Sequence, residues 1–426
     1  MTIQLSSLLD TDAEIIPWEK VDYSWIDIVE QATLSDTPPS YLIYPQTQDA
    51  LAKVVEYANK LQWSILPCGN GSKLNWGGLV KNPQLVISTQ HLNRIIDHAV
   101  GDLTVTVEAG VTLQQLQTLL QPHSQFLPLD PAYPDTATLG GIMATGDTGS
   151  WRQRYGGVRD MVLGLSFIRF DGKIAKGGGR VVKNVAGYDM MRLFTGSYGT
   201  LGIITQITFR LYPIHEASQT LLMTGKPDDI SILAQTLRQS GITPTAAEIL
   251  SSSLVQSLGE DGMGLMLRFQ SIPESITEQI RQVKKIAQPL DFKSTIYADL
   301  DEISIWSQLQ KSFNTSNADA KIVCKVGILP SSSIELLTKL EPFGLGMVNL
   351  GSGIGKLIIR KEGIEKMRSL CQNHQGYLSI LESPKSIKQT IDPWGYNGNA
   401  LDMMQKLKQK FDPNHLFSPN RFVGKI

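Results

Sequence analysis

Glycine residues gathered in a few short runs are the part of this sequence whose type and spacing indicate chemistry. Fifteen of the 37 glycines lie between Gly140 and Gly202, in runs that begin at Thr138, Lys176 and Gly196. An ordered glycine loses more backbone entropy than any other residue, so this cluster needs either positive φ angles or a backbone that approaches a large ligand closely. Apolar, strand-like segments flank the runs at 162–168 and 203–209. We therefore expect ordered backbone wrapped around a phosphate-bearing, mostly planar cofactor.

An earlier glycine loop, Cys68-Gly-Asn-Gly-Ser-Lys, directly follows a strand-like segment at 63–67. Successive backbone N–H groups in a glycine turn form a concavity that attracts an anion, and Ser72 adds a hydroxyl donor. Leu74 stands where the pattern Gly-x-Gly-x-x-Gly requires its third glycine, so a dinucleotide site of the Rossmann type is disfavoured. For this loop taken alone, a tight β-turn remains the alternative interpretation.

Strands and helices must position these loops. Thr47 reads as the N-cap of a helix, and Thr112 as the cap of another. The residues expected on the buried sides of these two helices are Leu51, Val54, Val55, Ala58 and Leu61 in the first, and Leu113, Leu116 and Leu119 or Leu120 in the second. Strands are expected at 41–44, 63–67 and 85–88, and a further one begins at Thr104 and ends in a turn at Gly110.

The second half of the chain alternates helical and strand patterns. Amphipathic helices are expected at 227–240 and 274–288, and strands at 264–269 and 321–326. A glycine cluster at 344–355 reads as a tight hairpin in preference to a ligand loop. A last helix carries Leu401, Met404 and Leu407.

Composition and charge limit the classes of function that the chain can have. The chain has 426 residues, 42% hydrophobic and 19% charged, with a formal net charge of −1, so attraction to nucleic acid is not indicated. The three cysteines are far apart, which argues against an iron–sulfur cluster of its own and fits a reducing compartment. No signal peptide and no membrane span are expected. The default location is the cytoplasm, with membrane association only through partner subunits.

Several ordered motifs point to one family. They are Pro67-Cys-Gly-Asn-Gly-Ser, Val107-Glu-Ala-Gly-Val, Thr138-Leu-Gly-Gly, Tyr155-Gly, Gly187-Tyr-Asp, Gly196-Ser-Tyr-Gly-Thr-Leu-Gly-Ile-Ile-Thr and Phe411-Asp-Pro-Asn-His-Leu-Phe-Ser-Pro-Asn. Residues 35–213 and the tail thereby resemble the FAD-binding domain of the vanillyl-alcohol oxidase / p-cresol methylhydroxylase (PCMH) superfamily. The segment beginning at Lys183-Asn-Val-Ala-Gly-Tyr-Asp and the ending Asp-Pro-x-x-x-Phe-x-Pro are most similar to the E subunits of bacterial glycolate oxidase.

The resemblance implies an FAD site that agrees with the expected backbone cradle. The loop at Cys68 would hold the pyrophosphate. The glycine run that begins at Thr138 would lie along the cofactor towards the flavin ring, and the run that begins at Gly196 would reach the adenosine end. The residues that inherit these roles are Cys68, Gly69, Asn70, Gly71 and Ser72; Thr136, Thr138, Gly140, Gly141, Ala144 and Gly149; and Gly202, Ile203 and Ile204.

The sequence also departs from the family. Many relatives attach the flavin to a His at the end of the first loop, where this chain has Ser72 followed by Lys73, so we expect non-covalent FAD. A cysteinyl-flavin bond at Cys68 is the less favoured alternative. Catalytic D subunits and related D-lactate dehydrogenases carry a stretch Gly-His-x-Gly-Asp-Gly-Asn-x-His, which is missing here. The spacing of the six histidines suggests no metal site.

Oxidation of a 2-hydroxy acid requires a cation for the carboxylate, a base for the hydroxyl proton and a flavin for the hydride. An arginine fork matches a carboxylate, and the candidate substrate ligands are Arg152, Arg154, Arg268 and Arg360, each with a structural role as the alternative. No catalytic base can be nominated from the sequence.

Three functions follow from these residues and the resemblance. The leading one is the E subunit of a glycolate oxidase/dehydrogenase complex, working with a catalytic D-type flavoprotein and an iron–sulfur F-type subunit on a small 2-hydroxy acid. The second is a self-sufficient FAD-dependent dehydrogenase for a 2-hydroxy acid. The third is an assembly subunit that binds FAD without turning anything over.

The expected fold class is α+β. It comprises an N-terminal extension at 1–34, a two-subdomain PCMH-type FAD-binding domain at 35–213, an α+β cap domain at 214–395, and a C-terminal segment at 396–426 that returns to the FAD domain.

Overall fold

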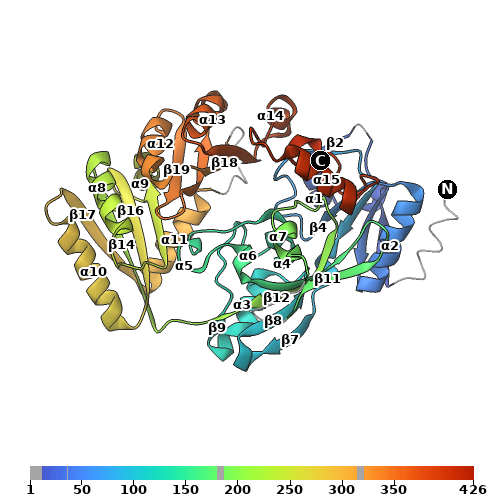
Figure 1. Ribbon diagram of the computed structural model, residues 1–426, viewed down its shortest axis with the longest axis horizontal. Coiled ribbons are helices and arrows are strands. Elements are labelled where there is room, and N and C mark those ends of the chain that lie inside the picture. The colour runs from blue at the N-terminus through green and yellow to red at the C-terminus, as the bar shows by residue number, and fades with distance from the viewer. Residues whose placement is uncertain (1–11, 36, 180–186, 314–320) are drawn as a thin grey trace.

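The computed structural model describes residues 12–35, 37–179, 187–313 and 321–426. A large sheet covered by helices forms one end of the molecule (Figure 1, yellow to orange), and two smaller sheets form the other (blue to green). The motif residues 183–186, at the start of the stretch most similar to glycolate oxidase E subunits, lie outside the described residues, as do residues 1–11 of the expected N-terminal extension.

The first small sheet has the strand order β1-β3-β6-β4. Strands β3 (Tyr41–Pro45), β6 (Leu85–Ser88) and β4 (Ile65–Cys68) are parallel, and β1 (Ala13–Pro17) adds an antiparallel edge. Helix α2 (Gln48–Leu61) begins where expected, because the Thr47 side chain accepts a hydrogen bond from Ala50 N at 3.1 Å. Its expected apolar stripe is buried except for Leu61, which is half-buried. Two elements that the sequence did not predict are β1 and α1 (Tyr23–Ala32).

The second small sheet is antiparallel, in the order β11-β10-β12-β8-β7. Its strands are Ile174–Gly178, Val162–Ile168, Ile203–Arg210, Thr104–Glu108 and Ile95–Ala99. Helix α3 (Leu113–Leu120) is capped by Thr112 as expected and buries Leu113, Leu116 and Leu120. Of the two alternatives for the last inner position, Leu120 is the buried one, and Leu119 is 37% exposed.

The glycine run that begins at Thr138 is helical and not a turn. Residues Leu139–Thr145 form helix α4, because the Thr138 hydroxyl caps Gly141 N at 3.2 Å. The remaining short elements of this half are α5 (Arg152–Tyr155), α6 (Val158–Met161), α7 (Met190–Phe194), β2 (Thr33–Leu34), β5 (Val80–Lys81), β9 (Gln125–Phe126) and β13 (Tyr212–Pro213).

The eight-stranded sheet is antiparallel, in the order β17-β14-β16-β15-β19-β20-β18-β21. In that order the strands are Phe292–Ala298, Ala217–Gly225, Met263–Ser271, Ala246–Leu250, Gly344–Asn349, Ile354–Ile359, Ile322–Gly327 and Tyr377–Glu382. The glycine cluster at 344–355 is the expected hairpin, formed by β19 and β20.

Helices cover this sheet unequally. One face packs against α8 (Pro227–Arg238), α10 (Pro273–Ala287), α12 (Ser333–Leu340) and α13 (Ile364–Asn373). The other face packs against α9 (Ser252–Ser257) and α11 (Asp299–Lys311). The central part of this second face turns towards the smaller sheets (Figure 1). Both helices expected between 227 and 288 are confirmed.

The C-terminal segment returns to the first small sheet. After α14 (Lys385–Thr390), helix α15 (Leu401–Phe411) leads into a bridge between Phe417 and Ile65. Arg421 O then accepts hydrogen bonds from Gly78 N at 2.9 Å and from Trp394 Nε1 at 3.1 Å. The expected domain boundaries remain predictions. Within the described part of the chain, no helix is long and apolar enough to cross a membrane.

Candidate functional site

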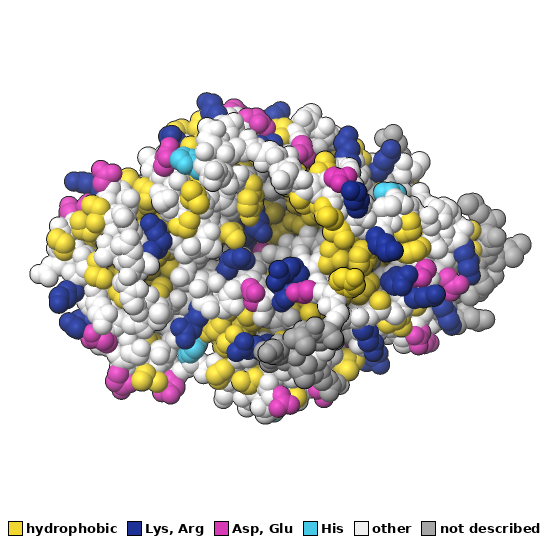
Figure 2. Space-filling model, in the orientation of Figure 1, with side chains coloured by type: hydrophobic (Ala, Val, Ile, Leu, Met, Phe, Trp, Pro, Cys, Tyr) yellow, Lys and Arg dark blue, Asp and Glu magenta, His cyan; other side chains and the backbone are white. Residues whose placement is uncertain are grey.

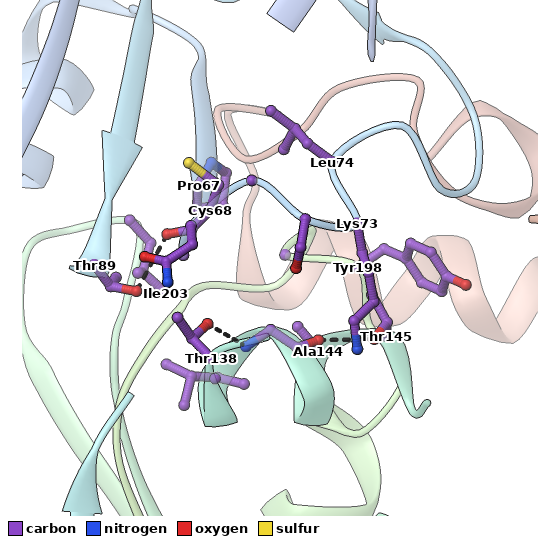
Figure 3. A pocket seen from close by; sticks show the side chains of 18 of the residues that line it. Pro67, Cys68, Lys73, Leu74, Thr89, Thr138, Ala144, Thr145, Tyr198 and Ile203 are labelled. Carbon is purple, nitrogen blue, oxygen red and sulfur yellow. Dashed lines mark hydrogen bonds between the residues drawn. The ribbon is translucent and has the colours of Figure 1, made fainter. Parts of the chain in front are cut away.

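An elongated pocket runs between the first glycine loop, helix α4 and the third glycine run (Figure 3). Ile203 and Thr89 lie at one side of the view, and Thr145 and Tyr198 at the other. The pocket is lined by Pro67, Cys68, Gly69, Asn70, Gly71, Ser72, Lys73, Leu74, Thr89, Thr138, Gly140, Gly141, Ala144, Thr145, Ser197, Tyr198, Gly199, Gly202, Ile203, Ile204 and Arg421.

The first loop presents its backbone to this pocket. Gly71 has φ of 77°, which favours glycine, and a Cβ at Gly69 would lie 2.1 Å from Thr138 Oγ1. In the described part of the chain, the N–H groups of Asn70, Gly71 and Ser72 donate no hydrogen bond within the protein. Because backbone donors are rarely left without a partner, three consecutive free N–H groups suit a phosphate.

The glycine runs that begin at Thr138 and Gly196 pack closely against their neighbours. A Cβ at Gly140 would lie 2.8 Å from Ala109 Cβ, and one at Gly199 would lie 2.9 Å from Pro67 Cγ. Tyr198 N donates to Ala144 O at 2.8 Å, which joins the third run to α4. The glycines therefore serve close packing around the pocket as well as turns.

Arg421 closes the pocket from the C-terminal tail. It is 4% exposed, and Nη2 donates to Leu74 O at 2.7 Å. Burial lowers the pKa of Arg421 to about 10. Its Nε and the hydroxyl of Ser197 are buried with no partner among the described residues. Since buried polar atoms are normally paired, these two atoms support a polar ligand in the pocket.

Twelve of the fourteen predicted FAD residues line this pocket. Thr136 does not, although its carbonyl accepts from Asn70 Nδ2 at 3.0 Å. Gly149 lies further on and lines two other cavities. Sequence reasoning missed Lys73, Thr89, Thr145 and Arg421. Lys73 directly follows the first loop and could have been found there, whereas Arg421 has no local signal.

The surroundings of Cys68 disfavour the reactive form of its thiol. Its Sγ donates to Ile87 O at 3.6 Å, and burial raises the pKa of the thiol to about 12. The thiolate, which is the nucleophilic form, is therefore disfavoured. This environment supports the expectation of non-covalent cofactor binding.

Two further cavities continue from the pocket towards the eight-stranded sheet. The larger, of about 310 Å³, is lined by Trp76, Asp130, Ala132, Tyr133, Gly149, Ser150, Trp151, Arg268, Ile303, Trp306, Ser307, Leu309, Gln310, Phe313, Val323, Met347, Lys356, Leu381 and Glu382. The smaller, of about 40 Å³, shares Thr145 and Tyr198 with the first pocket and Lys356 with the larger cavity. Figure 2 shows the surface hollowed between the two halves of the molecule.

Two of the four candidate arginines reach these cavities. Arg268 lines the larger cavity, and its Nε donates a hydrogen bond to Glu302 Oε1 at 3.0 Å. Arg152 lines the smaller cavity. Arg154 lines neither cavity. Burial lowers the pKa of His215, and the nearby charge of Arg154 lowers it further. Arg360 is exposed, and its guanidinium donates to Pro342 O.

Asp147 joins the two halves of the site. Its carboxylate accepts from Lys73 Nζ at 3.0 Å and lies 3.5 Å from Lys356 Nζ. Burial alone would raise the pKa of Asp147, but Lys356 and Lys73 outweigh burial and lower it to about 2. Asp147 is therefore ionised, and it connects the wall of the cofactor pocket with the eight-stranded sheet.

Comparison with known proteins supports the cofactor. Residues 39–178 match the protein family described as FAD binding domain. The chain is 26% identical to glycolate oxidase subunit GlcD of Bacillus subtilis over 91% of this chain and 89% of that protein. It is 26% identical to a D-lactate dehydrogenase of Archaeoglobus fulgidus over 95% of this chain and 100% of that protein. With glycolate oxidase subunit GlcE of Escherichia coli, the identity is 41% over 40% of this chain and 49% of that protein.

Among solved structures, p-cresol methylhydroxylase with substrate bound has a TM-score of 0.72 at 13% identity, over 96% of this chain and 98% of that chain. The expected α+β fold class of PCMH type is thereby confirmed. FAD as the cofactor and an FAD-dependent oxidoreductase acting on CH–OH donors as the enzyme class are confirmed as well. The free N–H groups and the unpartnered atoms of the pocket fit that cofactor. When bound, FAD supplies the hydride acceptor.

Proposed function

We propose that this chain is the E-type subunit of a glycolate oxidase/dehydrogenase complex. It holds dissociable FAD in the pocket between the first glycine loop, helix α4 and the glycine run that begins at Gly196. With a D-type flavoprotein and an iron–sulfur F-type subunit, it takes part in oxidising glycolate, or a similar small 2-hydroxy acid, to the 2-oxo acid. The identity to an E subunit, higher than to the D subunit although over a shorter stretch, supports this assignment. The cytoplasmic location expected from the sequence remains a prediction.

The observation that carries the proposal is the set of side chains around the smaller cavity. The stretch Gly-His-x-Gly-Asp-Gly-Asn-x-His of the D subunits is missing from the sequence, and no histidine is among the described residues that line the smaller or the larger cavity. Asn349 and Lys356 of the β19–β20 hairpin line the smaller cavity. A neutral imidazole can take a proton from substrate, whereas an amide cannot and an ammonium does not while charged. This favours a chain that depends on a D-type partner for turnover.

The larger cavity favours the second candidate, a self-sufficient 2-hydroxy-acid dehydrogenase. It brings Arg268, Lys356 and three tryptophans together beside the smaller cavity, which in turn adjoins the cofactor pocket. An arginine and a lysine beside apolar walls could hold a carboxylate and exclude water. The third candidate, a non-catalytic assembly subunit, has no feature of its own in its favour.

Anaerobic reduction of the bound flavin separates the three candidates. The purified chain is mixed with glycolate or D-lactate, with and without a D-type subunit, and absorbance near the flavin band is followed. Bleaching only with the D-type subunit is the expected result, provided that it exceeds the bleaching of the D-type subunit alone. Bleaching without any partner supports the self-sufficient enzyme. No change of this chain's flavin in the assembled complex supports the assembly subunit and rejects the proposal.

A further inference from the structure

The smaller cavity lies where the cofactor pocket meets the eight-stranded sheet. It shares Thr145 and Tyr198 with the cofactor pocket and Trp76, Gly149 and Lys356 with the larger cavity. A volume of about 40 Å³ is room for about three water-sized groups. That is the size of a carboxylate with the carbon next to it.

Polar side chains on the central strands face this cavity. Residues paired across neighbouring strands share a face, and the pairs Glu248–Asn349, Met347–Lys356 and Lys356–Lys325 run across β15, β19, β20 and β18. Charged groups on the inner strands of a buried sheet are costly unless they are paired. Their presence here needs an explanation beyond packing.

Two of the cations around the cavity have no partner. Within the described residues, the side chains of Arg152 and Lys325 make no ion pair and no hydrogen bond. Lys356 reaches only Asp147, at 3.5 Å, and that carboxylate is already bound by Lys73 at 3.0 Å. In the lining of the smaller cavity, ionised Asp147 thus stands beside three basic side chains, of which Lys325 has a pKa lowered by burial.

The second acid in the lining of the smaller cavity, Glu248, does not restore the balance. Burial raises its pKa to about 8, so that it is mostly protonated at neutral pH, and Asn349 Nδ2 donates to its Oε1 at 3.2 Å. Asp130 and Glu382 line the larger cavity instead. Burial raises the pKa of Asp130 to about 6, which leaves it mostly ionised at neutral pH, but its carboxylate already accepts from Ser150 N at 2.7 Å and Trp151 N at 3.2 Å. The lining of the smaller cavity therefore keeps a surplus of basic groups. The hydroxyl of Thr148 and Nε1 of Trp76, which also line the cavity, are buried without a partner in the part of the chain that the structure describes.

We propose that Arg152, Lys325 and Lys356 form a binding site for the carboxylate group of a small organic acid, with Thr148 as an additional donor. The proposal rests on the proposed function for the identity of that acid, a 2-hydroxy acid or its 2-oxo product. Arg268 is the weaker anchor, because buried Glu302 already compensates its charge. The proposal therefore assigns the carboxylate to the smaller cavity.

Isothermal titration of the FAD-loaded full chain with oxamate, a redox-inert monoanion, tests the site. Neutral glycolamide is the matched ligand. We expect one oxamate per chain and no measurable binding of glycolamide. Lys356→Met should weaken oxamate binding by about tenfold or more, as for the loss of a hydrogen bond between charged groups. Lys356→Arg should retain most of the affinity. Lys361→Met, which removes an exposed lysine of the same domain, should change nothing.

Equal affinity of Lys356→Met and the unaltered chain for oxamate overturns the proposal, and so does the absence of binding to the FAD-loaded chain. Oxamate binding that occurs only to FAD-free protein also overturns it, because the cations would then serve the cofactor itself. If Lys356→Met does not fold, Arg152→Gln provides the same comparison. Titration needs no D-type partner. Oxamate binding without flavin reduction in the complex would therefore reject the proposed function and leave the anion site standing.

Discussion

Lys408 and Asp412, one helical turn apart at the end of α15, form an ion pair of 2.6 Å from which water is excluded. Their side chains are 1% and 0% exposed. Lys408 Nζ also donates to Thr200 O at 2.8 Å and to Phe417 O at 2.9 Å. The pair therefore fastens the C-terminal helix to the third glycine run, which forms one wall of the cofactor pocket.

Replacing Lys408 should destabilise the whole FAD-binding half. Lys408→Met leaves the buried carboxylate of Asp412 without its cation, which costs about 3–5 kcal/mol in comparable pairs. Lys406→Met is the matched control, because the pair of Lys406 with Asp402 on the same helix is 70% and 77% exposed. We expect the control to lose about 1 kcal/mol or less. Urea unfolding of both variants measures the difference, and similar midpoints would contradict the assignment.

Adding one methyl group at Gly69 should prevent cofactor binding. A Cβ there would lie 2.1 Å from Thr138 Oγ1 and push away the hydroxyl that caps α4. Gly69→Ala should therefore reduce bound FAD per chain at least tenfold, as measured by absorbance of the gel-filtered protein. Gly101→Ala is the control, because nothing lies within 4 Å of its Cβ. A Gly69→Ala protein with full FAD content would show that the loop does not hold the cofactor.

Acid precipitation should release all of the flavin into the supernatant. The raised pKa of the buried Cys68 thiol keeps it from acting as a nucleophile. Cys68→Ala should accordingly bind as much FAD as the unaltered chain. Flavin that stays with the pellet in the unaltered chain but not in Cys68→Ala would establish a covalent link at this residue.

The stability of the chain should fall between pH 5 and 8 because of Glu248. Burial raises its pKa from 4.5 to about 8 in the folded state, so the folded chain holds a proton that the unfolded chain has lost. The stabilisation is complete below pH 4.5 and is lost as the pH rises to about 8. Each pH unit in this range lowers the free energy of unfolding by about 1 kcal/mol.

Glu248→Gln removes this dependence. The amide keeps an acceptor for Asn349 Nδ2 and never ionises. Relative to the unaltered chain, the variant should gain stability as the pH is raised from 5 to 8. Thermal melting at several pH values measures it, with the exposed Glu362→Gln as the control. Parallel melting curves for Glu248→Gln and the unaltered chain would show that Glu248 is ionised in the folded state.

Local patterns made much of the cofactor half predictable. Thr47 and Thr112 cap their helices as their spacing indicates, because an N-cap depends only on the next three residues. The glycine loop at Cys68 was predictable because its motif is likewise contained in a few consecutive residues. Strand β1 was missed because its pairing with β3 joins Ile15 to Ile43, and nothing within the short segment itself specifies that partner.

The groups that complete the site come from distant parts of the chain. Lys408 contacts Thr200 across 208 positions, and Arg421 contacts Leu74 across 347. Likewise, Arg268 and Arg360 both belong to strand patterns, yet only Arg268 faces a cavity. Which side of a strand faces the other half of the molecule is decided by tertiary packing, which a single sequence does not reveal.

The position of Arg421 has a consequence for biosynthesis. A ribosome makes the glycine loop that Arg421 covers some 350 residues before it makes Arg421. The nascent chain therefore cannot complete this wall of the FAD pocket until Arg421 has been translated. A deletion that removes Arg421 would accordingly leave the cradle open on this side, even though every one of its glycines had been made correctly.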